Sequence, residues 1–518
     1  MFKNMLARIR QVMYKMNLIK GIKKLTDKKE IPVNDEMYDL IEIWKAIYGG
    51  YYKDWHDTSY MTINGKKQRK RASMRMAKVA SQKMATLIFN EKCEINISEE
   101  SLEKTIKEVL KENKFNREFR RYLEYGFALG GMVMKAYYED EKIKISYTTA
   151  DCFIPLAWDN FRITEGVFVS TFRKGNNRYT HLEWHLWEDG EYVVRNELYE
   201  SKTDNEIGVK VPLSTQFKDL EEEIIFHTIK KTIFVYFKPN IANNFETNSP
   251  LGISIFANAL DTLKTLDIAF DSFQREFALG KKRIIVPASA IKTVVDPVTG
   301  QLSRYFDADD EVYESMPLGD GLDAEKVHDI SIELRVEEHV AAINANLNIL
   351  AMQIGFNAGT FTFDGVGVKT ATEVVSENSE TFRTKQDHET NVEAAIQELV
   401  DAIVEIADAF NVFPRPADYE VTVAFDDSIA QDKDADINEQ IKLLSNGLQL
   451  KKKALMKIHG LTEKEAEEML KEIQAEQATA TAEAIDFFGI NKNNQNKGQY
   501  PNSQASKALV NQQNQGAK

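Results

Sequence analysis

Two long amphipathic helices on either side of residues 281–333 constrain this chain more than any other feature. Apolar residues recur every three or four positions from Phe256 to Phe277 and again from Val336 to Ile354, which is the spacing of one helix face. The first helix is expected to begin at Ser249-Pro250 and to span about 28 residues, or roughly 42 Å. Because each stripe needs a neighbour to bury it, the pattern predicts a helical hairpin that carries 281–333 at its tip.

The segments before this hairpin change in periodicity. Helical patterns are expected at 35–48, 101–112 and 115–129, and short β-branched and aromatic runs follow from Gly131 to Phe237. Turn residues separate these runs, and Asp189-Gly190 is typical of a tight hairpin. The region is therefore predicted to be an antiparallel sheet, and the fold class of the chain to be α+β.

Charge is distributed unevenly along the chain. Residues 1–83 hold 19 Lys and Arg against 8 Asp and Glu, so this end carries +11 while the other 435 residues carry −25. The acid-free run from Gly65 to Lys83 is expected to continue as a helix with a basic face. Such a run is ordinarily a solvated face, and contact with DNA is the alternative. The net charge of −14 argues against a protein that coats DNA with its whole surface.

No charged residue occurs across the 24 positions from Val340 to Phe363, and Gly355 and Gly359 lie inside this stretch. Its length would suffice to cross a bilayer, but its asparagines and glycines make it too polar for a membrane span. A Gly-rich loop follows the second long helix, and Thr370-Ala-Thr-Glu373 is a capping box that begins another helix, extending to about residue 410.

Short helices are expected near the carboxyl end, at 432–446, 450–458 and 463–475. Beyond residue 490 the composition changes, because 13 of the last 28 residues are Asn or Gln. Disorder is the expectation for such a low-complexity segment.

Signatures of enzyme chemistry are weak in this sequence. Two cysteines exclude a disulfide scaffold and a multi-cysteine zinc site. His181 and His185 would lie ~13 Å apart on a strand, too far to share a metal, so surface histidines on a sheet are expected. The acids at 432–436 lack the glycine of a calcium loop, and 365–370 lacks the spacing of a phosphate loop. We therefore expect no enzyme activity and no catalytic, cofactor-binding or metal-binding residues.

Three long strings together resemble one known family, the portal proteins of tailed bacteriophages (head–tail connectors), in the branch of siphophages that infect Gram-positive hosts. They are SPLGISIFANALDTLKTLDIAFDSFQREFALGKKRIIVPASAIK at 249–292, GTFTFDGVGVKTATEVVSENSETFRT at 359–384, and FDDSIAQDKDADINEQIKLLSNGLQLKKKALMKIHGLTEKEAEEML at 425–470.

The resemblance implies the portal fold, in which a wing of helices and strands joins two stem helices, a small α/β clip, a tunnel loop with a long helix, and a helical crown. Mapped onto this chain, the implied segments are a basic N-terminal arm (1–30), the wing (31–248), stem helix 1 (249–280), the clip (281–333), stem helix 2 (334–355), the tunnel loop (356–368), the long wing/tunnel helix (369–410), the crown (411–480) and a disordered tail (481–518).

The resemblance also implies a structural function without a cofactor. Portal proteins form a ring, usually of about twelve subunits, at one capsid vertex. The ring is a conduit for double-stranded DNA during packaging and ejection. Implied partners are the terminase large subunit, the head–tail adaptor, and the major capsid and scaffold proteins, with no membrane. The implied location is the virion, and the host cytoplasm during assembly.

Two groups of residues are the expected sites. An uncharged, glycine-containing loop would touch DNA weakly, because strong Lys/Arg–phosphate contacts would resist sliding. Lys369 would be a cationic ring beside that loop or a solvated helix-start residue. Acids of the clip would bind a basic surface of a docking protein. The DNA-facing residues are predicted to be Asn357, Thr360, Thr362 and Lys369, and the clip-docking residues Asp307, Asp309, Asp310 and Glu311.

Two alternatives remain open at this point. Another virion structural protein, such as a minor head protein, would not need two long helices flanking an insert. A ring NTPase would need a nucleotide-binding loop, and none is found in the sequence.

Overall fold

The computed structural model describes residues 35–62, 65–160, 162–203, 206–280, 283–285, 292–295, 300, 302–305, 328–330, 333–363, 379–425, 433–459, 466–467, 469–471 and 473. The chain divides into two compact units, Met1–Ala430 and Gln431–Lys518. The predicted α+β class is confirmed, since helices and antiparallel sheets alternate along unit 1.

A six-stranded antiparallel sheet forms one layer of unit 1. Its strands pair in the order β10-β9-β8-β7-β6, and β11 also pairs with β9. Asp189 and Gly190 both have positive φ and join β8 to β9, as the sequence predicts. The bounds are β6 Phe153–Trp158, β7 Ile163–Lys174, β8 Asn177–Glu188, β9 Glu191–Ser201, β10 Val209–Val211 and β11 Glu223–Phe226.

A second sheet, of order β12-β4-β5, packs against the first. Phe153 and Phe168 of the large sheet contact Phe234 of the small one in a separate buried cluster. His185 is fully buried there and hydrogen-bonds to Glu183 and Tyr192, so the expectation of a surface histidine is wrong for this residue. The bounds are β4 Met132–Glu139, β5 Lys142–Thr149 and β12 Phe234–Phe237.

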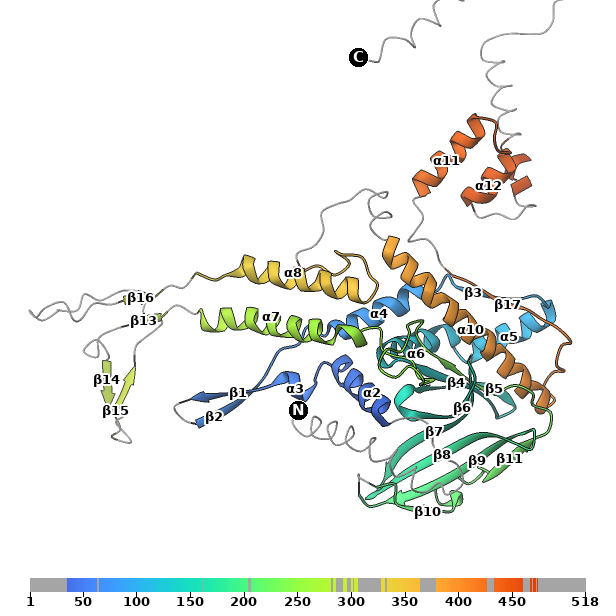
Figure 1. Ribbon diagram of the computed structural model, residues 1–518, viewed down its shortest axis with the longest axis horizontal. Coiled ribbons are helices and arrows are strands. Elements are labelled where there is room, and N and C mark those ends of the chain that lie inside the picture. The colour runs from blue at the N-terminus through green and yellow to red at the C-terminus, as the bar shows by residue number, and fades with distance from the viewer. Residues whose placement is uncertain are drawn as a thin grey trace, which may run out of the picture. The chain divides into compact units, whose positions relative to one another are not determined.

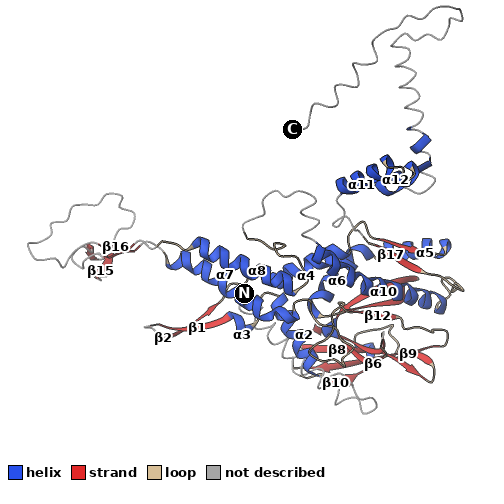
Figure 2. Cartoon of the chain, turned by 45° about the horizontal axis from the view of Figure 1, so that its top comes forward, coloured by secondary structure: helices blue, strands red, loops and turns tan. Residues whose placement is uncertain are grey.

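Helices cover the small sheet (Figure 2). Two helices expected at 35–48 and 115–129 are found with those bounds, and α6 ends at Gly130 as the sequence predicts. Phe119 of α6 is fully buried and packs against the rings of Phe89 and Phe115. The helices of this layer are α2 Asp35–Tyr48, α4 Met76–Ile88, α5 Glu100–Glu112, α6 Phe115–Leu129 and α10 Ser379–Ala409.

The predicted helical hairpin is present. The helices α7 (Leu260–Leu279) and α8 (Val336–Gln353) run side by side away from the sheets (Figure 1). Arg335 and Glu276 form an ion pair that joins them, with 3.0 Å between Nη2 and Oε2. Buried leucines near the body, such as Leu263 and Leu347, and the ring contact of Phe273 with His339 farther out add apolar packing to this ion pair.

The first of these helices begins later than the sequence indicates. Residues 249–256, where the helix was expected to begin, are not α-helical, and a 3-10 turn at Ala257–Ala259 precedes α7. Ile255 N–H donates to the Phe127 carbonyl, and Gly252 lies so close to Gly130 that a side chain on either would clash with backbone. This tertiary contact, and not the Ser-Pro start signal, decides the local structure.

The basic run is also different from the prediction. Gly65–Lys70 is a strand, β2, that pairs with β1 (Asp57–Thr62), and the helix α4 begins only at Met76. The short helix α3 (Lys53–His56) precedes this hairpin. Four of the eight basic residues of this run therefore lie on a two-stranded hairpin. Residues 71–75 form no helix, and the main-chain N–H groups of Ala72 and Met74 are bonded to α7 instead.

The remaining described elements are small. In the insert, β13 (Arg283–Ile285) pairs with β16 (His328–Ile330), and β14 (Lys292–Val295) pairs with β15 (Leu302–Tyr305). The crown was expected to begin at 411, but β17 (Val421–Ala424) pairs with β3 (Glu94–Ile97) and belongs to unit 1. Unit 2 contains α11 (Lys433–Ser445) and α12 (Lys451–His459), close to the predicted bounds.

Candidate functional site

The end of α8 is a tight turn that reverses the chain. Gly355 has φ +77°, a conformation that glycine adopts without strain. Phe356 N–H donates to the Ala351 carbonyl at 2.8 Å, and Gly355 N–H to that of Met352, which together form a Schellman cap. Phe356 is fully buried, so the loop that follows starts from a fixed point.

Two asparagines of α8 then hold the main chain of this loop. The Oδ1 atom of Asn348 accepts from Gly359 N–H at 2.8 Å, and that of Asn344 accepts from Phe363 N–H at 2.9 Å. The two asparagines are four residues apart and share one helix face. The polar residues of the uncharged stretch therefore position the loop on its own helix.

Asn357 connects the loop to α10. Its Oδ1 atom accepts from the main-chain N–H and the hydroxyl of Thr381, at 2.7 and 2.8 Å. The main-chain N–H of Asn357 donates to Thr381 Oγ1 at 2.9 Å. Thr381 is buried, so these bonds lie largely outside solvent. The side chain of Asn357 is an anchor in this arrangement.

Lys83 of α4 reaches the same loop from another side. Its Nζ atom donates to the Thr360 carbonyl at 3.3 Å and lies 5.3 Å from the ring centroid of Phe361, which is buried against Phe356. Burial lowers the pKa of the Lys83 ammonium. Residues 356–363 are therefore attached to three helices, α4, α8 and α10.

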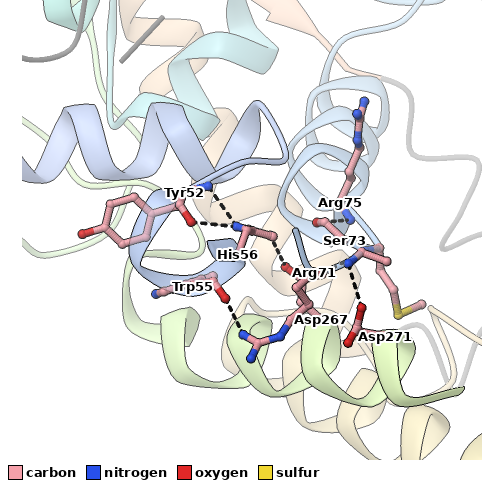
Figure 3. Close-up of polar contacts among 10 residues, drawn as sticks. Tyr52, Trp55, His56, Arg71, Ser73, Arg75, Asp267 and Asp271 are labelled. Atoms are coloured by element: carbon pink, nitrogen blue, oxygen red, sulfur yellow. Dashed lines mark hydrogen bonds and ion pairs between the residues drawn. The ribbon is translucent and has the colours of Figure 1, made fainter. Parts of the chain in front are cut away.

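A second polar site joins α7 to residues 71–75, just before α4 (Figure 3). Asp267 accepts from Met74 N–H at 2.8 Å and contacts His56 Nε2 at 3.1 Å. Asp271 accepts from Ala72 N–H at 3.1 Å. It also accepts hydrogen bonds from Nη1 and Nη2 of Arg69, at 2.5 and 2.7 Å. Burial disfavours the Asp271 carboxylate, but the Arg69 bonds and charge outweigh this and lower its pKa.

The predicted site residues are only partly brought together. Asn357 and Thr360 are half-buried in the anchored loop, and Thr362 is exposed beyond them. Lys369 and the clip acids Asp307, Asp309, Asp310 and Glu311 lie outside the described residues. Sequence reasoning missed the anchors Asn344, Asn348 and Lys83. The i, i+4 spacing of the two asparagines indicates a shared helix face, but not that this face holds the loop.

The described residues hold neither a candidate metal site nor a candidate membrane span. They contain no cluster of three or more His, Cys, Asp or Glu side chains that could hold a metal ion. Within that same part of the chain, no helix has the length and apolar character needed to cross a membrane.

Comparison with known proteins identifies the class of protein. Residues 22–481 match a family model described as "Phage portal protein, SPP1 Gp6-like". The class is therefore a structural, non-enzymatic component of a phage particle. More specifically, the chain belongs to the SPP1 Gp6-like family of phage portal proteins, which removes the NTPase and minor head protein alternatives.

Solved structures show a distant likeness in fold. One, titled "Virion of native gene transfer agent (GTA) particle", is 10% identical with a TM-score of 0.42, covering 86% of this chain and 99% of its own. Another, titled "Neck of empty GTA particle computed with C6 symmetry", is 11% identical with a TM-score of 0.43, covering 75% and 89%. No curated protein matches the sequence.

Proposed function

We propose that copies of this portal protein close into a ring, of about twelve subunits, that conducts double-stranded DNA during packaging and ejection. The observation that carries the proposal is the family match over residues 22–481, together with a long helical hairpin that ends in an anchored, uncharged loop. The ring would stand at one vertex of the capsid, beside the major capsid and scaffold proteins.

The loop supports this function because the exposed residues among 356–363 are uncharged and would bind DNA only weakly. Thr362 is exposed and uncharged at the end of the anchored segment. The last described loop residue is Phe363, and Lys369 follows it by six positions in the sequence. Contacts of this kind would hold a duplex weakly and let it slide. Asn357 and Thr360 would take part mainly by fixing where the loop leaves the helices.

The acids of the insert are proposed as the docking site for other machinery. Asp307, Asp309, Asp310 and Glu311 would bind a basic surface of the terminase large subunit during packaging, and of the head–tail adaptor afterwards. Neutralising all four should weaken terminase binding to the assembled portal. Unchanged binding would contradict this part of the proposal.

A photo-crosslinking experiment tests the DNA path. A photoreactive amino acid is placed at Thr362 of the full chain, and at Lys104 of α5 as the control, and both proteins are incorporated into DNA-filled particles. We expect crosslinks to DNA from position 362 only. Crosslinks from position 104 alone, or equal yields from both positions, would contradict the proposed path.

A further inference from the structure

A cationic pocket of about 480 Å³ opens between the β1–β2 hairpin, residues 71–75 and α7. Its charged lining comes from two segments that are far apart in the sequence, residues 69–75 and α7. A single carboxylate, that of Asp271, faces several cations. The charged residues that line the pocket are Arg69, Lys70, Arg71, Arg75, Arg275 and Asp271.

Part of this positive charge has no counterpart in the described chain. Arg69 is satisfied by Asp271, and Arg71 donates to the Trp55 carbonyl. Arg75 and Arg275 are exposed and form no ion pair with any residue that the structure describes. Figure 3 shows Arg75 pointing away from Asp271. The pocket therefore has room and charge for an external anionic group.

Lys70 is affected by the same excess of positive charge. Burial, and then the positive charge of Arg75, lower the pKa of the Lys70 ammonium, and the opposing effect of the Asp57 carboxylate is smaller. The ammonium lies 4.1 Å from the ring centroid of Tyr51, which compensates the charge only in part. An incoming carboxylate or phosphate would relieve the repulsion between these cations.

The surroundings of the pocket indicate a protein partner. Large apolar side chains are exposed on the hairpin and on the helix that line it, and aromatic residues, Met and Arg are enriched in protein–protein interfaces. A two-stranded hairpin such as β1–β2 is also marginally stable unless it packs on something. The exposed apolar residues are Tyr60 and Met61 on the hairpin and Ile268, Phe277 and Leu279 on α7.

The opposite helix of the hairpin has the complementary properties. Glu337 and Glu338 of α8 are exposed and make no ion pair within the described part of the chain. Val336, Ile349 and Met352 are exposed on the same helix, Met352 by 64%. One helix of the hairpin thus combines cations with apolar residues, and the other combines acids with apolar residues.

The two faces also lie at the same level along the hairpin. Glu276 of α7 pairs with Arg335 of α8, and Phe273 packs edge-on against the ring of His339. The acids at 337–338 are therefore level with the α7 residues that line the pocket. A ring axis parallel to the hairpin would preserve this height, and the acids of a neighbouring copy would then lie level with the pocket.

We propose that the α7 face of one subunit, including the β1–β2 hairpin, docks on the α8 face of the next copy of this chain, whose Glu337 and Glu338 enter the cationic pocket. This inference rests on the proposed ring. The two faces differ, so the contact is head-to-tail and closes into a ring when the rotation between copies allows it. The pocket is completed only by the partner copy.

Charge reversal and charge exchange test the contact. The full chain is prepared as R75E/R275E, as E337K/E338K and as the combination of all four changes. We expect each double variant to raise the protein concentration needed for ring formation by about tenfold or more, measured by analytical ultracentrifugation and native mass spectrometry, since each replaces attraction by like-charge repulsion. The fourfold variant should recover most of the wild-type ring, because the charges are exchanged.

The matched control is K104E/K111E, which makes the same charge change on exposed lysines of α5 and should leave assembly unchanged. The fourfold variant also controls for folding, as do circular dichroism spectra of every protein. Rings that tolerate both reversals, or a fourfold variant no better than the doubles, would overturn the interface while leaving the ring proposal intact. A wild-type chain that stays monomeric would overturn the ring itself.

Duplex DNA is the competing occupant of the pocket. Binding of a fluorescent duplex by wild-type and R75E/R275E protein is compared by anisotropy. Equal affinity, with assembly impaired, is the result we expect. Weaker DNA binding with unimpaired assembly would assign the pocket to DNA and overturn the proposal.

Discussion

Apolar residues are buried in the sheet-and-helix body of unit 1 but partly exposed in the outer part of the α7–α8 hairpin. Phe119, Leu123 and Phe127 of α6 are all fully buried within the one chain. Phe277 and Leu279 at the end of α7 are 45% and 52% exposed. The comparison teaches that a long apolar stripe predicts burial without saying which chain supplies the partner surface.

The largest effect is expected in the body. Phe119→Ala removes a ring that packs against Phe89 and Phe115, and should lower the free energy of unfolding by about 3–5 kcal/mol. Urea unfolding of the full chain measures the loss. A change below about 1 kcal/mol would mean that this part of the body is less tightly packed than the structure indicates.

The junction between body and hairpin should be next in size. Asp271→Asn weakens the charged bonds to Arg69 and should cost about 1.5–3 kcal/mol at neutral pH. Because the folded-state pKa of Asp271 is lowered, its contribution is present above the ordinary value of 3.8 and is lost as the pH falls through the folded-state value. The wild-type and variant unfolding curves should therefore converge below pH 3.8, and parallel curves would contradict this.

The loop anchor is expected to contribute less. Asn357→Ala removes the two bonds that Oδ1 accepts from Thr381 and should cost about 1 kcal/mol, with faster hydrogen exchange at the Thr381 amide, which loses its acceptor. The control is Thr362→Ala, at an exposed neighbour, which should change neither quantity. Equal effects of the two substitutions would show that the loop is not anchored through Asn357.

The smallest effect on the folding of one chain is expected at the end of the hairpin. Phe277→Ser should lower the free energy of unfolding by less than about 1 kcal/mol, since 45% of the side chain is already exposed and its ring packs edge-on against Phe273. The same substitution should reduce ring formation, measured by ultracentrifugation at fixed concentration. A large loss of monomer stability would show that the hairpin buries this ring within its own chain.

Sequence periodicity predicted those elements whose structure is decided locally. The helix at 115–129 ends at a glycine, so its bounds follow from the sequence, and turn residues separate the antiparallel strands of the region that follows it. The start of α7 and the path of residues 71–75 could not be predicted in this way. They depend on Gly130, Asp267 and Asp271, which are distant in sequence from the segments that they hold.

The candidate site was predicted in outline and not in detail. The uncharged, glycine-containing loop after α8 was expected, and the structure places 356–363 there. The hydrogen-bond partners of its asparagines could not be derived from the sequence. An asparagine side chain can bond to water on an exposed helix face, to a main-chain amide of a loop, or to a ligand. Only the fold shows that Asn344, Asn348 and Asn357 are bonded to the chain itself.

The most direct test of the central claim is a cryo-electron microscopy map of the purified full-length protein. We predict a closed ring in which the α7 face of each subunit contacts α8 of the next, with the residues after α8 bordering the axial opening. A ring joined through the β6–β11 sheet with residues 356–363 on its outer rim, or a monomer at high concentration, would contradict the account.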